Sequence, residues 1–512
     1  MKRLYILLEV AVSVVGLRAH AYLPEATPEE SGIPSEAIMS WINACEREID
    51  AVHGFVLLRH GRLVAEGYWA PFARDVTHAM FSHSKSFTST AVGLLLDDGK
   101  ISLDERVADI FPEKLPAAPC RNLLEMRVRD LLQMSTGHDH DLAYDAINPG
   151  EDDWVKAFFA EVPKSRPGMA FNYNTLATHV LSAIVSRRTG GNMMDLLKKR
   201  LLDPVGISSA WSWNAPDGTA IGGYGMNFTC RDLALFGQLY LQKGEWNGVH
   251  LLSENWVRLA SAKQISNAPH SNPEAGAGYG FQFWRCTPHG VYRADGALGQ
   301  YTIVMEDQDA VLSLISGTET TQRELELVWK HLLSAMGPAP LAENPAACSA
   351  LRRRCAALAL PVPTGVRDGG DFIGKTFALQ DNIFGAKWIR LERSGDGLVF
   401  VWGNACGVQR APLGFGEWKR GGKVRIQPGE IYYLREIPGE HPVAGAGAWV
   451  DGRTFDVKLW FYDRPSFFAA TLRFANDGGV VVSGRFRAKN LCDLSVRGVP
   501  MPAGDLKGSP NP

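Results

Sequence analysis

The chain lacks the features that mark several common protein classes. Its 53 basic and 55 acidic residues leave a formal net charge of −2, so no excess of one sign points to nucleic acid or to an acidic membrane surface. After the first twenty residues, no segment approaches the roughly 20 apolar residues that cross a bilayer. We therefore expect no nucleic-acid partner and no stable membrane span.

The eight cysteines are scattered and form no C-x-x-C pair. In a chain of 512 residues this favours buried free thiols in a reducing compartment over a disulfide framework or a zinc site. The His138-Asp139-His140 segment has no further ligands at useful spacing, so a loop-stabilising role is preferred. We expect no bound metal.

Two motifs with a known mechanism give no support for a function here. Residues 369–376 fit the pattern G-x-x-x-x-G-K-[ST], but the segments that follow them look like strands, whereas a phosphate-binding loop must lead into a helix. No G-x-S-x-G segment is present, which argues against the α/β-hydrolase fold. We expect no nucleotide and no other cofactor.

The start of the chain resembles a signal peptide in its pattern of charge and hydrophobicity. It has a charged pair at residues 2–3, an apolar stretch over 4–17 and an A-x-A tripeptide at 19–21, although Glu9 and Arg18 weaken the match. The cysteine usage favours a cytoplasmic location, and export is the alternative if this segment is cleaved.

Strand and helix signals divide the chain into two kinds of sequence. Strand patterns near residues 52–69, 278–284 and 301–316 flank a helical middle, which predicts one sheet built from distant parts of an α/β domain. From Asp371 onward, short alternating strands separated by Gly, Asn and Asp turns predict an all-β barrel or sandwich. We place an N-terminal segment at 1–27, the first domain at 28–336, a linker at 337–368, the β-domain at 369–500 and a mobile tail at 501–512.

The most informative local pattern is Ser82-x-x-Lys85 at the mouth of an apolar helix. Three residues apart, the two side chains share one helical face, so a neutral lysine amine can take the serine proton. The helix N-terminus adds N–H groups and a positive dipole end that stabilise an oxyanion. Taken alone, the pattern also fits an N-cap serine beside a solvated lysine.

Two further segments supply what acyl transfer by a serine needs. The loop over residues 167–175 leads into a helix and presents Tyr173, a polar group for the leaving atom. Residues 292–301 begin a strand in which Gly296 permits close backbone approach to a ligand.

With these three elements in this order, the chain resembles the beta-lactamase-related serine hydrolases. That group includes class C beta-lactamases, D-amino-acid-specific peptidases, family VIII carboxylesterases and 6-aminohexanoate-dimer hydrolases. The resemblance covers roughly residues 28–335 and rests on segments 81–90, 98–113, 131–141, 167–185, 230–246 and 294–317. It implies a beta-lactamase/transpeptidase-like α/β (α+β) domain, with an antiparallel sheet flanked by helices.

The resemblance also implies roles, carried over by position. Ser82 becomes the acylated nucleophile, and Lys85 is its proton acceptor or electrostatic activator. Tyr173 is the general base or the proton relay to the leaving group, and which of Lys85 and Tyr173 is the base stays open. The backbone N–H groups of Ser82 and Ala297 would form the oxyanion hole.

One departure from the family concerns its Tyr-x-Asn triplet, which reads Tyr173-Asn174-Thr175 here. The asparagine stands one place early. Its polar role in substrate binding therefore passes to Thr175, or to Asn174 if the loop shifts.

A second departure removes a cation. The family's Lys-Thr-Gly or His-x-Gly motif reads Ala294-Asp295-Gly296, and the adjacent Arg293 would point to the opposite face of the strand. Loss of a charge-assisted contact weakens recognition of a beta-lactam carboxylate by about 1.5–3 kcal/mol. We therefore expect a small-molecule ester or amide substrate.

Three functions compete. The first is a carboxylesterase-like hydrolase that forms an acyl-enzyme, and the second is a D-amino-acid peptidase or amidase, or a weak beta-lactamase. The third is a non-catalytic binding protein on a degenerate hydrolase fold. The β-domain would either cover the active-site cleft or mediate contacts in a homodimer.

Overall fold

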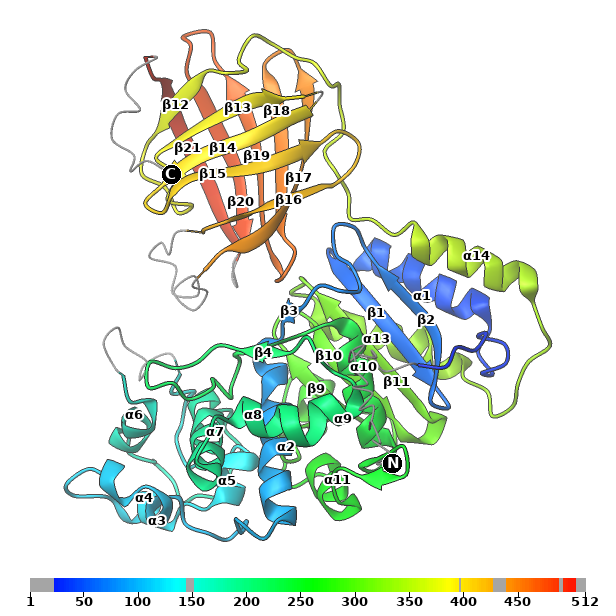
Figure 1. The fold of residues 1–512 in the computed structure, drawn as a ribbon, viewed down its shortest axis with the longest axis vertical. Helices are drawn as coiled ribbons and strands as arrows, with labels where there is room; N and C mark the ends of the chain where they lie inside the picture. The colour runs from blue at the N-terminus through cyan, green and yellow to red at the C-terminus, as the bar shows by residue number, and fades with distance from the viewer. Residues whose placement is uncertain (1–22, 144–151, 396, 427–438, 488–490, 503–512) are drawn as a thin grey trace, which may run out of the picture.

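The computed structural model describes residues 23–143, 152–395, 397–426, 439–487 and 491–502 (Figure 1). The signal-like start of the chain and nearly all of the predicted tail lie outside these residues. Figure 1 shows a body of helices around a sheet, followed by an all-β body. Among the described helices, none is long and apolar enough to cross a membrane.

The first body is built around a six-stranded antiparallel sheet in the order β2-β1-β11-β10-β9-β8. Early β1 pairs with late β11, so the prediction of one sheet built from distant segments is confirmed. The strands are β1 (Val52–Arg59), β2 (Arg62–Tyr68), β8 (Trp284–Arg285), β9 (Val291–Gly296), β10 (Gln300–Met305) and β11 (Ala310–Ser316).

Helices cover both faces of this sheet (Figure 1). Alternate residues of β1 point to opposite faces, so Phe55 packs with α1 and α13, whereas Val56 packs with α2 and α10. Burial on both faces explains why β1 reads as a continuous apolar run. These helices are α1 (Ser35–Glu48), α2 (Ser84–Asp97), α10 (Cys230–Leu241) and α13 (Thr321–His331), and α14 (Pro345–Ala356) packs on α1 from within the predicted linker.

The middle of the chain is helical, as its periodicity indicates. Its helices are α3 (Val107–Ile110), α4 (Arg121–Glu125), α5 (Val128–Leu132), α6 (Trp154–Ala160), α7 (Thr175–Thr189), α8 (Met193–Leu197), α9 (Asp203–Val205), α11 (Glu254–Ser261) and α12 (Pro273–Gly276). Short strands lie among them: β3 (His78–Ala79), β4 (Trp211–Ser212), β5 (Met226–Phe228), β6 (Glu245–Trp246) and β7 (Val249–His250).

The sequence predicts a strand over residues 278–284, and this prediction is wrong for most of the segment. The Phe281 N–H donates to the Ala260 carbonyl (2.9 Å), and the Gln282 N–H donates to the Leu132 carbonyl (3.1 Å). Gln282 also has a φ of 67°, outside the extended range. Long-range bonds to helical segments therefore hold this stretch as a loop, and only Trp284–Arg285 forms a strand.

The second body is a ten-stranded sheet in which β15 also pairs with β17, so the sheet closes into a barrel. The sequence left barrel and sandwich open. Gly445 permits the closing contact, because a Cβ there would lie 2.5 Å from the Pro412 carbonyl oxygen. The strands are β12 (Thr376–Leu379), β13 (Trp388–Ser394), β14 (Gly397–Asn404), β15 (Gly407–Gly414), β16 (Lys419–Val424), β17 (His441–Asp451), β18 (Thr454–Phe461), β19 (Ser466–Phe474), β20 (Val480–Arg487) and β21 (Leu491–Pro500).

Buried histidines make the stability of the fold depend on pH. Burial lowers the pKa of His78, His138 and His179 to about 4, and that of His83 to about 3. An unfolded histidine titrates near 6.5, so between pH 6.5 and about 4 the unfolded chain binds more protons than the folded one. We predict full stability above about pH 6.5 and a falling melting temperature as the pH is lowered, with up to about 1.4 kcal/mol lost per pH unit for each histidine.

Thermal melts between pH 7 and 5 test this prediction, because most carboxylates stay ionised there. His179→Gln should reduce the slope of melting temperature against pH. His289→Gln, whose side chain is 93% exposed, should leave the slope unchanged. Equal slopes for both variants and the parent chain would contradict the prediction.

Candidate active site

Ser82 lies in a 3₁₀ turn, Phe81–His83, between strand β3 and helix α2. Phe81 has a φ of 47°, which a bulky residue rarely adopts, so the chain turns sharply just before the serine. His83 and Ser84 are buried, whereas Ser82 is partly exposed. The hydroxyl is thus presented at the N-terminus of a helix that is itself fixed in the core.

Lys85 lies one turn into α2 with a side chain that is almost completely buried. Its Nζ donates to Ser82 Oγ (3.2 Å), to Thr175 Oγ1 (3.2 Å) and to the Gly223 carbonyl oxygen (2.7 Å). The predicted serine–lysine contact is present. The lysine connects three segments that are distant in sequence.

Tyr173 lies beside this pair. Lys85 Nζ is 4.9 Å from the centroid of the Tyr173 ring. Trp284 stacks on the same ring at a centroid distance of 5.8 Å, and Tyr279 meets it edge-on at 6.5 Å. Tyr279, in the loop over residues 278–283, and Trp284 of strand β8 therefore pack against Tyr173 and hold its ring near the Lys85 amine.

The two residues after Tyr173 have different surroundings. Asn174 is buried and caps α7, since its Oδ1 accepts from the Ala177 N–H (3.2 Å). Thr175 faces Lys85 and donates its hydroxyl to Asp141 Oδ2 (2.7 Å). The place beside the lysine is therefore occupied by Thr175 and not by Asn174.

Asp141 and the Gly223 carbonyl are absent from the sequence prediction. Asp141 accepts from both the N–H and the hydroxyl of Thr175, each at 2.7 Å, and so orients that hydroxyl toward Lys85. It ends the 131–141 segment on which the family resemblance partly rests, which was the available signal. The contribution of Gly223 is a backbone atom, and no side-chain pattern could reveal it.

Strand β9 reaches, at Gly296, the Phe81–His83 turn, which carries the predicted nucleophile Ser82 and is called the nucleophile turn below. A Cβ on this residue would lie 2.2 Å from the Met80 carbonyl oxygen and 3.1 Å from the His83 nitrogen. The following turn is held by Gln300, whose Nε2 donates to the carbonyl of Ala297 (3.2 Å) and to that of Ser316 (2.7 Å). Gly296 thus packs against the turn that carries Ser82, and Ala297, which the sequence predicts as an oxyanion-hole residue, is the next residue along the chain.

The strand also shows what replaces the family's cation. Ala294 is fully buried, and Arg293 is bound elsewhere, because its Nε donates to Asp295 Oδ2 (2.8 Å). Arg293 Nη1 also lies 3.7 Å from Glu274. Asp295 therefore contacts an arginine of its own strand, and Arg293 is not directed toward the position of the missing cation.

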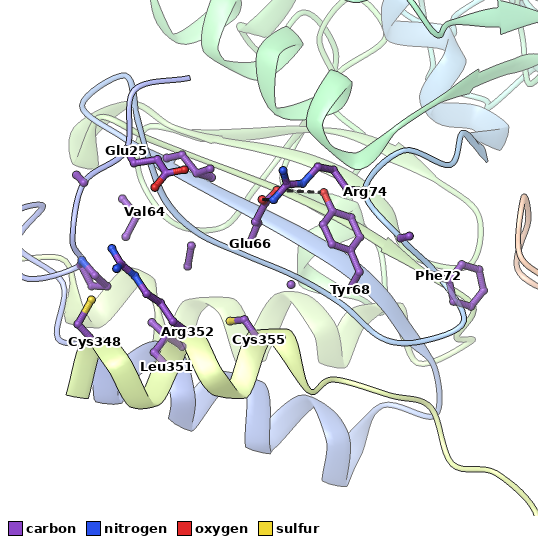
Figure 2. A pocket seen from close by; sticks show the side chains of 17 residues that line it. Glu25, Val64, Glu66, Tyr68, Phe72, Arg74, Cys348, Leu351, Arg352 and Cys355 are labelled. Atoms are coloured by element: carbon purple, nitrogen blue, oxygen red, sulfur yellow. Dashed lines mark hydrogen bonds and ion pairs between the residues drawn. The ribbon is translucent and has the colours of Figure 1, made fainter. Parts of the chain in front are cut away.

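A separate cavity of about 480 Å³ lies at the opposite edge of the sheet, between β2 and α14 (Figure 2). Glu66, Tyr68 and Arg74 line it together with Arg352 and Cys355, and none of the predicted site residues does. Within the described ranges, no three His, Cys, Asp or Glu side chains are placed to hold a metal ion.

The sequence around this site matches a known family. The beta-lactamase family model matches residues 42–335, more than half of the 512 residues. The chain belongs to the beta-lactamase family. The contacts of Ser82, Lys85 and Tyr173 described above all lie within the matched region.

Similar proteins support the assignment to this family. A 6-aminohexanoate-dimer hydrolase of Paenarthrobacter ureafaciens is 27% identical over 249 residues, which are 45% of this chain but only 63% of that relative's length. A Bacillus anthracis structure, provisionally named as a hydrolase of the same kind, is 20% identical with a TM-score of 0.50, over 61% of this chain and 86% of that one. EstCE1, a hydrolase with promiscuous acyltransferase activity, is 15% identical with a TM-score of 0.50, over 59% and 99%. At these identities the two structures show the shared fold alone.

Thr175→Val tests the contact between the hydroxyl and Lys85. We predict that labelling of Ser82 by a fluorophosphonate probe slows about 10- to 100-fold, because the lysine loses a hydrogen-bond partner that Asp141 orients. The shape of the side chain is preserved, but Lys85 and Asp141 each lose a hydrogen-bond partner, so the free energy of unfolding should also fall by about 1–3 kcal/mol.

Asn174→Ala is the matched comparison. It removes a helix cap and should cost about 1 kcal/mol of stability, with a much smaller effect on labelling. The reverse pattern, in which Asn174→Ala slows labelling more than Thr175→Val, would contradict this interpretation of the triplet.

Proposed function

We propose that this beta-lactamase family member is a serine hydrolase that cleaves small esters or amides through a covalent acyl-enzyme, in the manner of a carboxylesterase. The observation that carries the proposal is the buried Lys85 Nζ, 3.2 Å from a partly exposed Ser82 Oγ at a helix N-terminus. A nucleophile within hydrogen-bond distance of a base, with a third group orienting that base, is the arrangement that acyl transfer requires. Here Thr175 and Tyr173 orient the lysine.

In the proposed first half-reaction, Lys85 is neutral, so its two N–H groups stay on Thr175 and the Gly223 carbonyl and its lone pair faces Ser82. The amine accepts the proton of Ser82 while Oγ forms a bond to the substrate carbonyl carbon. The resulting oxyanion accepts hydrogen bonds from the N–H groups of Ser82 and Ala297. The bond to the leaving group then breaks, and the leaving alcohol or amine takes the proton back through Lys85 or Tyr173. In the second half-reaction, water adds to the acyl-enzyme and releases the acid and free Ser82.

The surroundings of the site favour a neutral substrate. Ala294 offers no charge, and Arg293 is engaged by Asp295 and Glu274, so a substrate carboxylate would lack the cation that a beta-lactam requires. The names of the relatives, a 6-aminohexanoate-dimer hydrolase and a hydrolase with acyltransferase activity, agree with a small acyl substrate. An aminohexanoate dimer carries a carboxylate, so these names support the reaction class and not the neutral charge of the substrate.

Ser82→Ala tests the nucleophile. We predict that hydrolysis of a short-chain aryl ester falls by about a thousandfold or more, and that fluorophosphonate labelling is lost. Ser89→Ala is the matched control, because Ser89 is a buried serine of the same helix that bonds to the Phe281 carbonyl. Full activity in Ser82→Ala would overturn the proposal, and an unlabelled parent chain would favour the binding-protein alternative.

A substrate panel tests the missing cation. We predict measurable hydrolysis of an aryl ester and of a linear amide, with kcat/KM for a chromogenic cephalosporin at least about tenfold below that for the ester, since one charge-assisted contact is worth about 1.5–3 kcal/mol. Preference for the cephalosporin would contradict the argument from Ala294. Preference for D-amino acid amides would favour the peptidase alternative.

A further inference from the structure

We propose that the C-terminal barrel is a positioning element of the active site, which clamps the two backbone segments that carry the oxyanion-hole N–H groups. The inference rests on the proposed function, because that function assigns the hole to Ser82 and Ala297. The barrel makes two separate contacts that lead to these residues, and each comes from a different part of its sheet.

The first contact holds the strand that enters the nucleophile turn. β3 is the edge strand of a small sheet in the order β3-β5-β4, and the Met80 N–H on its inner side donates to the Met226 carbonyl (3.0 Å). On the outer side, the Ala79 N–H donates to the carbonyl of Asp463 (2.9 Å). Asp463 lies in the barrel turn between β18 and β19, so the barrel completes the hydrogen bonding of β3 three residues before Ser82.

Charges fix this barrel turn. The carboxylate of Asp463 accepts from Arg464 Nε (3.0 Å) and contacts His441 Nδ1 (3.0 Å). The Arg464 side chain is only 1% exposed, and its guanidinium lies 5.7 Å from the ring centroid of Trp213 in the first body. A buried pair of charges costs too much to separate, so the turn has little freedom to move.

The second contact supports the turn that carries Ala297, the other proposed oxyanion-hole residue. Arg487 of β20 is buried, donates through Nη1 to the Gly317 carbonyl, and donates through Nη2 to Asp50 Oδ2 (3.1 Å). The next residue, Thr318, donates its N–H to the Leu298 carbonyl (3.3 Å), in the turn that carries Ala297. Arg487 therefore supports the β9–β10 turn through one intervening segment.

We call the contacts through Asp463 and Arg487 the two arms of the barrel. The barrel also packs on a histidine pair. Trp460 of β18 meets the His53 ring edge-on at a centroid distance of 5.1 Å. His53 Nδ1 lies 3.1 Å from His78 Nε2, and His78 Nδ1 donates to the Ala79 carbonyl (3.1 Å). This row of contacts ends on the same strand that Asp463 holds.

These arms matter because an oxyanion hole works only when its donors are preorganised. Donors must point at the position of the developing charge, and a displacement of about 1 Å can cost about a hundredfold in rate. Loosening either arm should therefore reduce kcat, which depends on the transition state, and leave KM nearly unchanged.

The test compares three variants in aryl ester hydrolysis. Arg487→Met keeps the apolar stem and loses both hydrogen bonds, and Asp463→Asn weakens the fixed turn. Trp418→Phe is the control, since it loses an interface hydrogen bond to the Leu360 carbonyl (2.8 Å) that leads to neither arm. We expect kcat to fall about tenfold or more in the first two variants with KM within about twofold, partial rescue in Arg487→Lys, and kcat unchanged in the control. Unchanged kcat in both arm variants, a rise in KM alone, or an equal loss in Trp418→Phe would overturn the proposal.

Amide hydrogen exchange provides a readout that does not depend on activity. Arg487→Met should speed exchange in a peptide over residues 296–300, and Asp463→Asn should speed it over 78–84, with neither change in Trp418→Phe. Unchanged exchange in both peptides would overturn the clamp. If the parent chain hydrolyses nothing, the proposed function fails, whereas exchange still decides whether the barrel holds these segments.

Discussion

The close approach of strand β9 to the nucleophile turn is the constraint on which the rest of the site depends. The Met80 carbonyl oxygen lies so close to Gly296 that a Cβ on this residue would be only 2.2 Å from it, so a residue without a side chain is needed here. This approach brings a strand from near residue 296 to a helix that begins near residue 84. Both faces of the central sheet are covered by helices, so the two elements are held together by the core and not by the site alone.

The polar contacts of Lys85 also depend on segments that are distant in the sequence. A buried amine needs hydrogen-bond partners, and it finds them in Ser82, Thr175 and the Gly223 carbonyl, from three different parts of the chain. Asp141 then fixes Thr175 from a fourth part. The proposed catalytic arrangement and the packing of the helical middle therefore share these residues, and a substitution at one of them should affect both activity and stability.

The barrel enlarges this structure beyond the region that the beta-lactamase family model matches. Its turn at Asp463 contacts Ala79, three residues before Ser82. Its strand residue Arg487 contacts Gly317, whose neighbour Thr318 bonds to the turn that carries Ala297. If the proposed clamp operates, the second body contributes to the rate without contributing a group that touches the substrate. Such a division would let the barrel vary in sequence while these contacts are kept.

The sequence by itself determined what depends on local periodicity. Helical spacing places Ser82 and Lys85 on one face, and the family resemblance indicates Gly296. Apolar runs at both ends of the first domain predict its sheet, and alternating apolar residues predict the all-β body. Tertiary structure alone decided the rest, because it depends on partners far away in the chain. Those partners make Thr175 rather than Asn174 face the lysine, bring in Asp141 and Gly223, and turn residues 278–283 into a loop. Closure of the barrel likewise required two strands that no local pattern could pair.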